Sequence, residues 1–343
     1  MTGKRICRGI CAFALVAGLA LANPGWAGAQ ETIQVQVSNG VVQIPPEHPQ
    51  LVWLDTDIGD DIDDAFAVGL LLRSAEVRLL GISTAYGDTE LRARLVDRFL
   101  ADSGGDLWTK MPIPVTAGVR TKATNGGLTQ AAYGWRIPER AHPDGVEAAL
   151  AAIRLHPGEI TLIAIGPLFN VGAMIDRDAE TFKKLKLVVM MGGSVARGYD
   201  GGHGELRPAD AEWNIKCDPK DAAKLLAAGV PIFMMPLDST QIHLESEQRE
   251  RMFAADTPVT DQIALLYHQW VANTGAHWTT PTLYDPVAVA YAIRPELCPM
   301  KAMRLEVDDA GFTKPVSGEP NAEVCMKLDE AGFLSFLEAR LQQ

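Results

Sequence analysis

The sequence has few cysteines, which excludes a fold held together by a disulfide framework. Five occur in 343 residues, and two of them, Cys7 and Cys11, lie in an N-terminal segment that we expect to be removed. The three that remain are too few for a disulfide scaffold. Cys298 and Cys325 either pair in an oxidising compartment or stay as buried, inert thiols, and the sequence favours the thiols.

The chain also lacks an excess of positive charge. Its 31 lysines and arginines are outnumbered by 43 aspartates and glutamates, giving a net charge of −12. This balance disfavours a partner that is a nucleic acid or an anionic membrane surface. Up to half of the net charge can come from one acidic segment, residues 55–64, for which a cation is the obvious partner.

The first thirty residues predict a secretory signal. A basic start is followed by an apolar run over residues 11–22 and by a small-x-small pattern at 27–29. The run is short for a membrane span, and no second hydrophobic segment follows that would anchor the chain. We therefore predict cleavage after Ala29, no membrane anchor after cleavage, and export, to the periplasm if the source is Gram-negative. An uncleaved anchor is the weaker alternative.

The rest of the chain predicts one α/β domain. We expect residues 1–29 to be the signal peptide, 30–49 an extended lead-in and 50–343 a single catalytic domain, because no linker, repeat or low-complexity stretch divides it. Apolar runs alternate with amphipathic segments, which is typical of an open, mainly parallel, Rossmann-like sheet flanked by helices. Expected strands are 51–54, 77–84, 112–118, 160–166, 185–193, 230–237, 303–309 and 322–329; expected helices are 63–73, 89–102, 218–229 and 330–341.

Polar motifs follow the predicted strands directly. "DTDIGDDIDD" comes after the first strand, "YGD" after the second, "GPLFN" after "LIAI" and "GGS" after "VVMM". In open α/β sheets, ligands bind beyond the carboxyl ends of the strands. These distant motifs are therefore expected to converge on one site.

The segment "DTDIGDDIDDA" contains six carboxylates within ten positions, from Asp55 to Asp64. Capping of the following helix can explain one or two of them, and Gly59 permits the tight turn. Oxygen ligands without nearby cysteine or histidine suit calcium or magnesium better than zinc. The spacing does not fit an EF-hand.

Five motifs in order carry a resemblance to a known family. They are "DTDIGDDIDDA", "AIGPLFNVGAMI", "VVMMGG", "AEWNIKCDPKDAA" and "TLYDPVAVAY". Together they resemble the nucleoside hydrolases of the inosine-uridine preferring type, from about residue 50 to the end. The resemblance implies an open α/β fold, a calcium ion at the base of the pocket, and hydrolysis of the N-glycosidic bond of ribonucleosides to free base and ribose. It also implies a dimer or tetramer, which the sequence itself does not show.

The resemblance implies a set of metal ligands. Asp57 matches a calcium ligand that also acts as general base, and Asp64 and Asp285 match further ligands. Ile165 matches the residue that offers its backbone carbonyl to the metal. Asp55, the first acid of the motif, matches a residue with a supporting role.

The resemblance also implies residues that bind the substrate. Asp63 matches the acid that holds ribose hydroxyls, and Glu212 and Asn214 match ribose-binding positions. Met191 is expected beneath the sugar. Asp88 stands where many members have asparagine and others aspartate, and either side chain can bond ribose.

One departure from the family concerns the departing base. Many members have a histidine just before the late calcium-binding aspartate, and this histidine can protonate the base. Here the position is Tyr284, which we expect to stack on the base while a solvent path supplies the proton, and this suggests purine preference. Nearby alternatives, each more often a packed or surface side chain, are Tyr267, His268, His277 and Trp278.

A second departure lies in "DGGHGELRPADAEWN", where the asparagine that usually contacts the sugar is not matched. His203 or Glu205 substitutes for it, or the segment is a lid. Asp60 and Asp61 are a two-residue expansion of the shorter "DxDPGxDDA" form, and the sequence assigns them no chemistry.

Two other functions fit parts of the pattern. A phosphatase of the haloacid dehalogenase type also has "DTD" after its first strand, but it does not predict "DDIDDA", "AEWNI" or "YDPVAVA". A calcium-dependent nucleoside-binding protein without catalysis fits the missing histidine. Phosphatase activity, or tight binding without turnover, would distinguish these alternatives from a hydrolase.

Overall fold

The computed structural model describes residues 36–38, 41–43, 48–105, 112–123, 127–201, 205–275 and 279–343. Residues Val35–Gln343 form one compact unit. The predicted signal peptide lies outside the described residues, as do His203, His277 and Trp278. Within the described part of the chain, no helix is both long enough and apolar enough to cross a bilayer.

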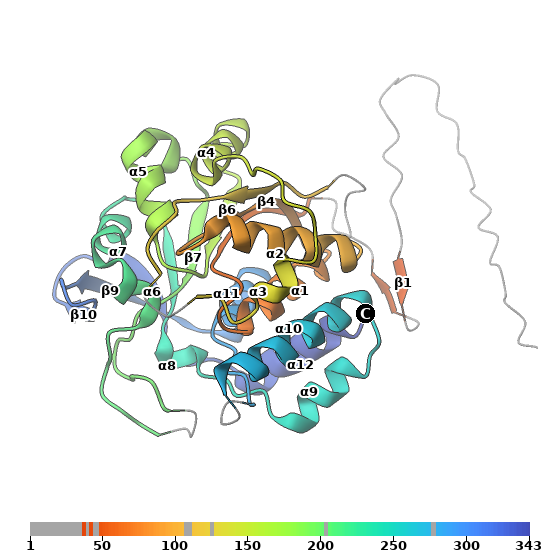
Figure 1. The fold of residues 1–343 in the computed structure, drawn as a ribbon. Helices are drawn as coiled ribbons and strands as arrows, with labels where there is room; N and C mark the ends of the chain where they lie inside the picture. The colour runs from red at the N-terminus through yellow and green to blue at the C-terminus, as the bar shows by residue number, and fades with distance from the viewer. Residues whose placement is uncertain are drawn as a thin grey trace, which may run out of the picture. The chain divides into compact units, whose positions relative to one another are not determined.

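A nine-stranded sheet forms the centre of the described residues, in the order β10-β9-β11-β8-β7-β6-β3-β4-β5 (Figure 1). The strands that the sequence predicts are all part of it, so the α/β class is confirmed. They are β3 (Gln50–Thr56), β4 (Val77–Thr84), β5 (Val115–Ala117), β6 (Ile160–Ala164), β7 (Leu187–Met191), β8 (Ile232–Met235), β9 (Met300–Val307) and β11 (Ala322–Cys325).

The sheet is mainly parallel, as predicted, with antiparallel pairing at one edge. The strands from β5 to β11 pair in parallel, while β9 runs antiparallel to both β11 and β10 (Thr313–Val316). The sequence did not predict β10, because three of its four residues are exposed and one is a proline, as is common in an edge strand. A second hairpin, β1 (Gln36–Ser38) with β2 (Val41–Gln43), forms within the predicted lead-in.

Helices cover both faces of the sheet (Figure 1). The apolar cluster on one face joins β3 to α1, α2, α10, α11 and α12, and the cluster on the other joins it to α4, α5 and α7. Successive β3 side chains alternate between the clusters, with Leu54 in the first and Trp53 in the second. The helices are α1 (Asp63–Leu72), α2 (Thr89–Asp102), α3 (Ala131–Gly134), α4 (Gly145–Leu155), α5 (Phe169–Phe182), α6 (Trp213–Cys217), α7 (Pro219–Leu226), α8 (Leu237–Thr240), α9 (Ser246–Phe253), α10 (Pro258–Thr274), α11 (Asp285–Ile293), η1 (Pro295–Leu297) and α12 (Glu330–Leu341).

The strand order places a switch point between β3 and β6. From β3 the chain proceeds outward to β4 and β5, and it then returns to β6 and continues in the opposite direction to β7 and β8. A crevice opens at the carboxyl ends of two strands whose connections diverge in this way. The acidic segment follows β3, and "GPLFN" follows β6, so both reach this crevice.

Two buried helices begin at the crevice. All ten residues of α1 are buried, including Asp63 and Asp64 in its first turn. Helix α11 packs against α1 and begins with Asp285. The partial positive charge at the two helix N-termini favours carboxylates there.

Cys298 and Cys325 are joined by a disulfide, with their Cα atoms 5.9 Å apart. The preference for inert thiols at these positions was therefore wrong. Cys298 precedes β9 and Cys325 ends β11, so the pairing depends on how these two strands meet, which local sequence does not reveal. Cys217 is a free cysteine.

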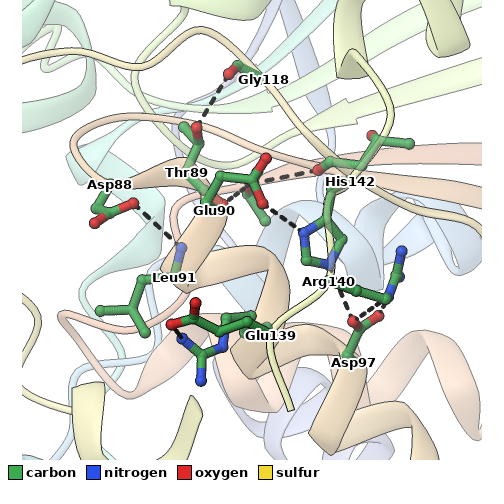
Figure 2. A network of polar contacts seen from close by, with 12 residues as sticks. Asp88, Thr89, Glu90, Leu91, Asp97, Gly118, Glu139, Arg140 and His142 are labelled. Atoms are coloured by element: carbon green, nitrogen blue, oxygen red, sulfur yellow. Dashed lines mark hydrogen bonds and ion pairs between the residues drawn. The ribbon is translucent and has the colours of Figure 1, made fainter. Parts of the chain in front are cut away.

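A polar network fastens the segment before α4 to α2 (Figure 2). His142 is buried and places Nδ1 2.7 Å from Glu90 Oε2 and Nε2 3.0 Å from Asp97 Oδ2. Arg140 donates two hydrogen bonds of 2.6 Å to Asp97. Burial acts to lower the pKa of His142, but the hydrogen bonds to Asp97 and Glu90 outweigh it and raise that pKa. The network helps to fix α2, which carries Arg92 to the acidic segment.

We predict that this network stabilises the fold most at low pH. Because the pKa of His142 is higher folded than unfolded, its contribution is complete below about pH 6.5 and is lost as the pH rises through the folded value. Replacing His142 with Gln should therefore cost more at pH 6 than at pH 9, by about 1 kcal/mol. Urea unfolding of both proteins measures this. A cost independent of pH would contradict it.

Candidate active site and metal centre

The acidic segment turns sharply between β3 and α1. Gly59 adopts φ of +124°, in a region where side chains other than glycine are strained. A Cβ atom at this position would also lie 2.8 Å from Leu128 Cδ2. The turn folds the segment back so that carboxylates from both of its ends meet.

A buried arginine braces the turn. Arg92 donates to Asp60 Oδ2 at 2.7 Å, to the Ile58 carbonyl at 3.0 Å and to the Asp57 carbonyl. Its side chain has no exposed surface. Sequence reasoning missed Arg92 and gave Asp60 no role. The extra acid is now seen to pair with the buried guanidinium that holds the backbone of the turn.

Three predicted metal ligands meet at the base of the crevice. Asp57, Asp64 and Asp285 are buried, and each places one carboxylate oxygen within 4.8 Å of the others. Calcium holds oxygens at 2.3–2.6 Å, so oxygens around one ion lie up to about 5 Å apart. The three carboxylates fit such a shell. Asp64 also accepts a hydrogen bond from the Thr56 hydroxyl, which fixes its orientation.

Ile165 and Gly166 lie beside these carboxylates. The Ile165 carbonyl accepts a hydrogen bond of 3.2 Å from Asn214 Nδ2, and a carbonyl oxygen has a second lone pair for a metal. A Cβ atom at Gly166 would lie 2.9 Å from Asp57 Oδ1. A larger residue at 166 would therefore displace the Asp57 carboxylate.

The electrostatics of the site call for a positive charge. Burial raises the pKa of Asp57 to about 7, although Arg92 acts against the shift. Burial, and then neighbouring carboxylates, raise the pKa of Asp64 and Asp285 well above the usual range. A nearby cation strongly stabilises the ionised form of carboxylates whose pKa is raised in this way. The residues present thus fit a divalent metal ion.

Asp55 lies behind the metal ligands. It is fully buried, and its Oδ1 accepts hydrogen bonds from the Ser83 hydroxyl and from Asn170 Nδ2 at 2.7 Å. Burial raises its pKa to about 6, although Ser83 and Asn170 act against this. Its Oδ2 has no hydrogen-bond partner among the described residues. Asp55 is not among the residues that line the cavity.

A cavity of about 620 Å³ opens above the carboxylates. All predicted site residues except Asp55 and Asp88 line it. These are eight residues predicted to act through their side chains, together with Ile165, which was predicted to act through its backbone carbonyl. The lining is Asp57, Asp60, Asp61, Asp63, Asp64, Thr129, Ile165, Met191, Tyr199, Glu212, Trp213, Asn214, Trp270, Asn273, Thr274, Tyr284 and Asp285. This volume suits a small molecule such as a nucleoside.

Four of the predicted sugar-binding residues, Asp63, Met191, Glu212 and Asn214, line the same cavity as the metal-binding carboxylates. Asp63 Oδ2 accepts a hydrogen bond of 3.0 Å from the Asp285 backbone, which joins the starts of α1 and α11. Glu212 caps α6 and accepts backbone hydrogen bonds from Gly193 at 2.8 Å and Asn214 at 2.9 Å. Burial raises the pKa of Glu212 to about 7. Met191 lies at the end of β7.

Asp88 is not among the residues that line the cavity. It is the N-cap of α2, where its Oδ1 accepts a hydrogen bond of 3.3 Å from Leu91 N, and its Oδ2 lies 3.0 Å from Arg120 Nη2. An aspartate at a helix start satisfies an otherwise unpaired N–H group. The sequence "YGDT" fits the start of a helix as well as it fits a ribose-binding position.

Tyr284 does line the cavity, as predicted. Its ring packs edge-on against Tyr199, with centroids 6.2 Å apart. Burial, and then the charge of Asp61, raise the pKa of the Tyr284 hydroxyl, so that it stays protonated at neutral pH. A protonated hydroxyl can donate a hydrogen bond.

The described alternatives to Tyr284 point elsewhere. Tyr267 is buried against Phe253 and donates to the Thr279 carbonyl at 2.7 Å, and His268 is exposed. Glu205, which was predicted as a substitute for the missing sugar-contacting asparagine and not for Tyr284, pairs with Arg207 at 2.8 Å on the surface. None of these three residues lines the cavity.

Sequence reasoning missed the aromatic side chains that line the cavity together with Tyr284. Tyr199, Trp213 and Trp270 come from a loop, from α6 and from α10. Trp213 stands between Glu212 and Asn214 in "AEWNI", so the motif was a signal for it. Tyr199 and Trp270 carried no such signal, because an aromatic residue in a loop or on an amphipathic helix is usually a packing residue.

An open α/β sheet with a carboxylate-lined cavity at its switch point is typical of an enzyme that acts on a small molecule with the help of a cation. The sequence identifies the family. Over residues 52–335 it matches the inosine-uridine preferring nucleoside hydrolases, and the chain belongs to this family. The protein is therefore a glycosyl hydrolase of ribonucleosides.

A relative agrees with this assignment, and two solved structures share the fold. The pyrimidine-specific ribonucleoside hydrolase RihA of Enterobacter sp. (strain 638) is 30% identical over 322 residues, covering 85% of this chain and 97% of the relative. A plant nucleoside hydrolase, PpNRh1, superposes with a TM-score of 0.73 at 23% identity, covering 86% of this chain and 99% of its own. A purine-preferring ribonucleoside hydrolase from Gardnerella vaginalis superposes with a TM-score of 0.70 at 22% identity, covering 85% and 98%.

We predict that Arg92 is essential to the fold of the site. Replacing Arg92 with Met should lower the free energy of unfolding by about 3–5 kcal/mol, because it removes the buried guanidinium that bonds Asp60 and two backbone carbonyls. Arg251→Met, which removes a half-exposed ion pair with Glu338, is the matched control and should cost less than about 1 kcal/mol. Urea unfolding measures both. Equal costs would contradict the bracing role.

Proposed function

We propose that the protein is a calcium-dependent ribonucleoside hydrolase that favours purine nucleosides and acts outside the cytoplasm. The observation that carries the proposal is the meeting of three buried carboxylates and the Ile165 carbonyl position at the base of one cavity. The family supplies the reaction, which is hydrolysis of the N-glycosidic bond.

Calcium suits this donor set better than other common ions. The ligands are carboxylate oxygens with a backbone carbonyl nearby, which favours a hard cation over zinc. Magnesium demands a smaller, near-octahedral shell, whereas calcium accepts irregular shells of six to eight oxygens. Asp57, Asp64, Asp285 and the Ile165 carbonyl would hold the ion, with substrate hydroxyls and water completing the shell.

The chemistry assigned to this chain's residues is general base catalysis. When bound, calcium supplies a Lewis acid that makes water more acidic. Asp57 accepts a proton from the water whose oxygen attacks C1′ of the ribose, while the C1′–N bond breaks and its electron pair leaves with the base. No covalent intermediate with the enzyme is formed, so the reaction should invert the anomeric carbon.

Recognition of ribose is assigned to Asp63, Glu212 and Asn214. These buried polar groups lie around the metal ligands and would bond the sugar hydroxyls. A 2′-deoxy substrate would leave some of them without partners inside a closed site, which costs more than the lost contact alone. We therefore expect strong discrimination against deoxynucleosides.

The preference for purines is argued from the aromatic lining of the cavity. Tyr284, Tyr199, Trp213 and Trp270 offer ring faces and edges, and the larger purine ring system gains more from them than a pyrimidine does. The names of the relatives point both ways, since RihA is called pyrimidine-specific and the Gardnerella enzyme purine-preferring.

We predict that Asp57→Asn lowers kcat on inosine by about 10²–10⁴-fold, the range expected for loss of a general base. Removing divalent ions with a chelator should abolish turnover, and calcium should restore it. Asp176→Asn, which alters an exposed carboxylate paired with Lys224, is the control and should leave kcat unchanged. Full activity of Asp57→Asn, or of the chelated enzyme, would contradict the mechanism.

We predict that inosine and adenosine are cleaved with higher kcat/KM than uridine and cytidine. Hydrolysis of 2′-deoxyinosine should be at least about 100-fold slower than that of inosine, because a site built for a hydroxyl rejects the analogue that lacks it. Release of free base from this panel measures both ratios. Faster cleavage of uridine would overturn the purine preference and leave the hydrolase assignment intact.

Export is proposed from the N-terminal pattern and is supported by the disulfide. A bond between Cys298 and Cys325 is stable in an oxidising compartment and is uncommon in a reducing one. We predict that the mature protein begins at Gln30 and is found in the periplasmic fraction of a Gram-negative host. Mass spectrometry of the purified protein tests this, and an intact N-terminus in the cytoplasm would contradict it.

A further inference from the structure

We propose that the hydroxyl of Tyr199 donates a hydrogen bond to the 5′-hydroxyl of the ribose, so that turnover depends on that hydroxyl. The inference deepens the proposed function and rests on it. Tyr199 lies in the loop between β7 and α6 and lines the cavity. Its backbone is fixed by the neighbouring elements, and its side chain spans two sides of the cavity.

A carboxylate holds the start of this loop. Asp238, in the first turn of α8, accepts hydrogen bonds from three successive backbone N–H groups, those of Val195 at 2.8 Å, Ala196 at 2.9 Å and Arg197 at 3.1 Å. These hydrogen bonds are charge-assisted, and such bonds are stronger than neutral ones. The loop therefore leaves β7 along a fixed path.

One side chain fixes both neighbours of Tyr199. Gln241 is 7% exposed, its Oε1 accepts from Asp200 N at 2.7 Å, and its Nε2 donates to the Gly198 carbonyl at 3.1 Å. The loop also doubles back closely here, since a Cβ atom at Gly198 would lie 2.2 Å from the Pro208 carbonyl oxygen. Tyr199 is thus held through the backbone on both sides, which gives its side chain a defined direction.

The Tyr199 side chain reaches from the side of the cavity assigned to the base to the side assigned to the ribose. Its ring meets Tyr284 edge-on, with centroids 6.2 Å apart. Its hydroxyl oxygen accepts a hydrogen bond of 2.9 Å from the backbone N–H of Trp213. Trp213 stands at the start of α6, between Glu212 and Asn214. The hydroxyl therefore lies beside the two α6 residues that are assigned to ribose.

The proton of the Tyr199 hydroxyl is available to a ligand. A tyrosine hydroxyl both accepts and donates, and the N–H of Trp213 uses only its accepting role. Within the part of the chain that the structure describes, no group accepts a hydrogen bond from this hydroxyl. Because the side chain lines the cavity, a bound molecule can be the acceptor.

The two α6 side chains assigned to ribose lack a donor of their own. Glu212 receives backbone hydrogen bonds at both carboxylate oxygens, which favours the ionised form, and this form only accepts. Both protons of the Asn214 amide are donated to backbone carbonyls, those of Ile165 and Met191, at 3.2 Å each. A sugar hydroxyl donates and also accepts, so it needs a donor from the site. Tyr199 supplies this donor.

The 5′-hydroxyl is the one that reaches this side of the cavity. Attack at C1′ places C1′ and the neighbouring 2′-hydroxyl at Asp57, whereas C4′, which carries the 5′ carbon, lies beyond the ring oxygen. The loop with Tyr199 and then α6 follow β7, and β6 separates β7 from β3 and its acidic segment. Groups that follow β7 therefore face the part of the ribose that is remote from Asp57.

Tyr199→Phe tests the assignment, because it removes the hydroxyl and keeps the ring against Tyr284. Wild type and variant are assayed on the preferred ribonucleoside and its 5′-deoxy analogue, either inosine with 5′-deoxyinosine or uridine with 5′-deoxyuridine. For the wild type, kcat/KM should be about 10–100-fold lower on the analogue, because buried polar groups lose their partner. In Tyr199→Phe the ratio of the two kcat/KM values should fall by at least about 5-fold, because only the ribonucleoside loses a hydrogen bond.

Tyr291→Phe is the matched control and should leave the ratio unchanged, since Tyr291 packs against Phe233 and does not line the cavity. An unchanged ratio in Tyr199→Phe, whether both rates fall or neither does, would mean that the hydroxyl only supports Trp213, and it would overturn the proposal. Equal cleavage of the ribonucleoside and its 5′-deoxy analogue by the wild type would also overturn it and leave the hydrolase assignment intact. A wild type that cleaves no ribonucleoside would refute the proposed function itself.

Discussion

The structure depends on one electrostatic constraint, the gathering of carboxylates in a buried crevice at the end of β3. Asp57, Asp63, Asp64 and Asp285 are almost without exposed surface, and burial raises the pKa of each. Several buried carboxylates cannot all be ionised unless positive charge lies among them. The protein supplies part of this charge, and a divalent cation would supply the rest.

The fold provides the protein's share of that charge at three places. The starts of α1 and α11 bring the positive ends of two helix dipoles to the crevice. Arg92 comes from α2 and binds the turn from behind, through Asp60 and two carbonyls. The switch point between β3 and β6 lets these elements meet. The chain runs from β3 in one direction across the sheet and from β6 in the other, which opens the crevice between them. The strand order, the turn held by Arg92 and the two helix starts thus all bring favourable positive charge to the same carboxylates.

Much of this arrangement could be predicted from the sequence, since the predicted strands are apolar runs and several of the motifs follow them directly. Asp57 and Ile165 are far apart in the chain, yet each follows a parallel strand and strand ends in a parallel sheet share one edge, so their meeting was expected, whereas the place of Asp285 was implied only by the family resemblance. Features that depend on tertiary contacts were not predictable. Arg92 is one of several arginines on α2, and only packing shows which acid it meets. The motif around Asp88 suits a helix cap and a ligand equally well. Pairing of Cys298 with Cys325 follows from how separate segments lie together.

The central claim is that the buried carboxylates form one calcium site. Calorimetric titration of the chelator-treated protein with calcium measures it most directly, because it reports binding without needing a substrate. We expect one ion per chain, with binding at least about 100-fold weaker in Asp64→Asn, since that variant loses one charged ligand. Absence of binding at millimolar calcium, or equal affinity in wild type and Asp64→Asn, would contradict the account.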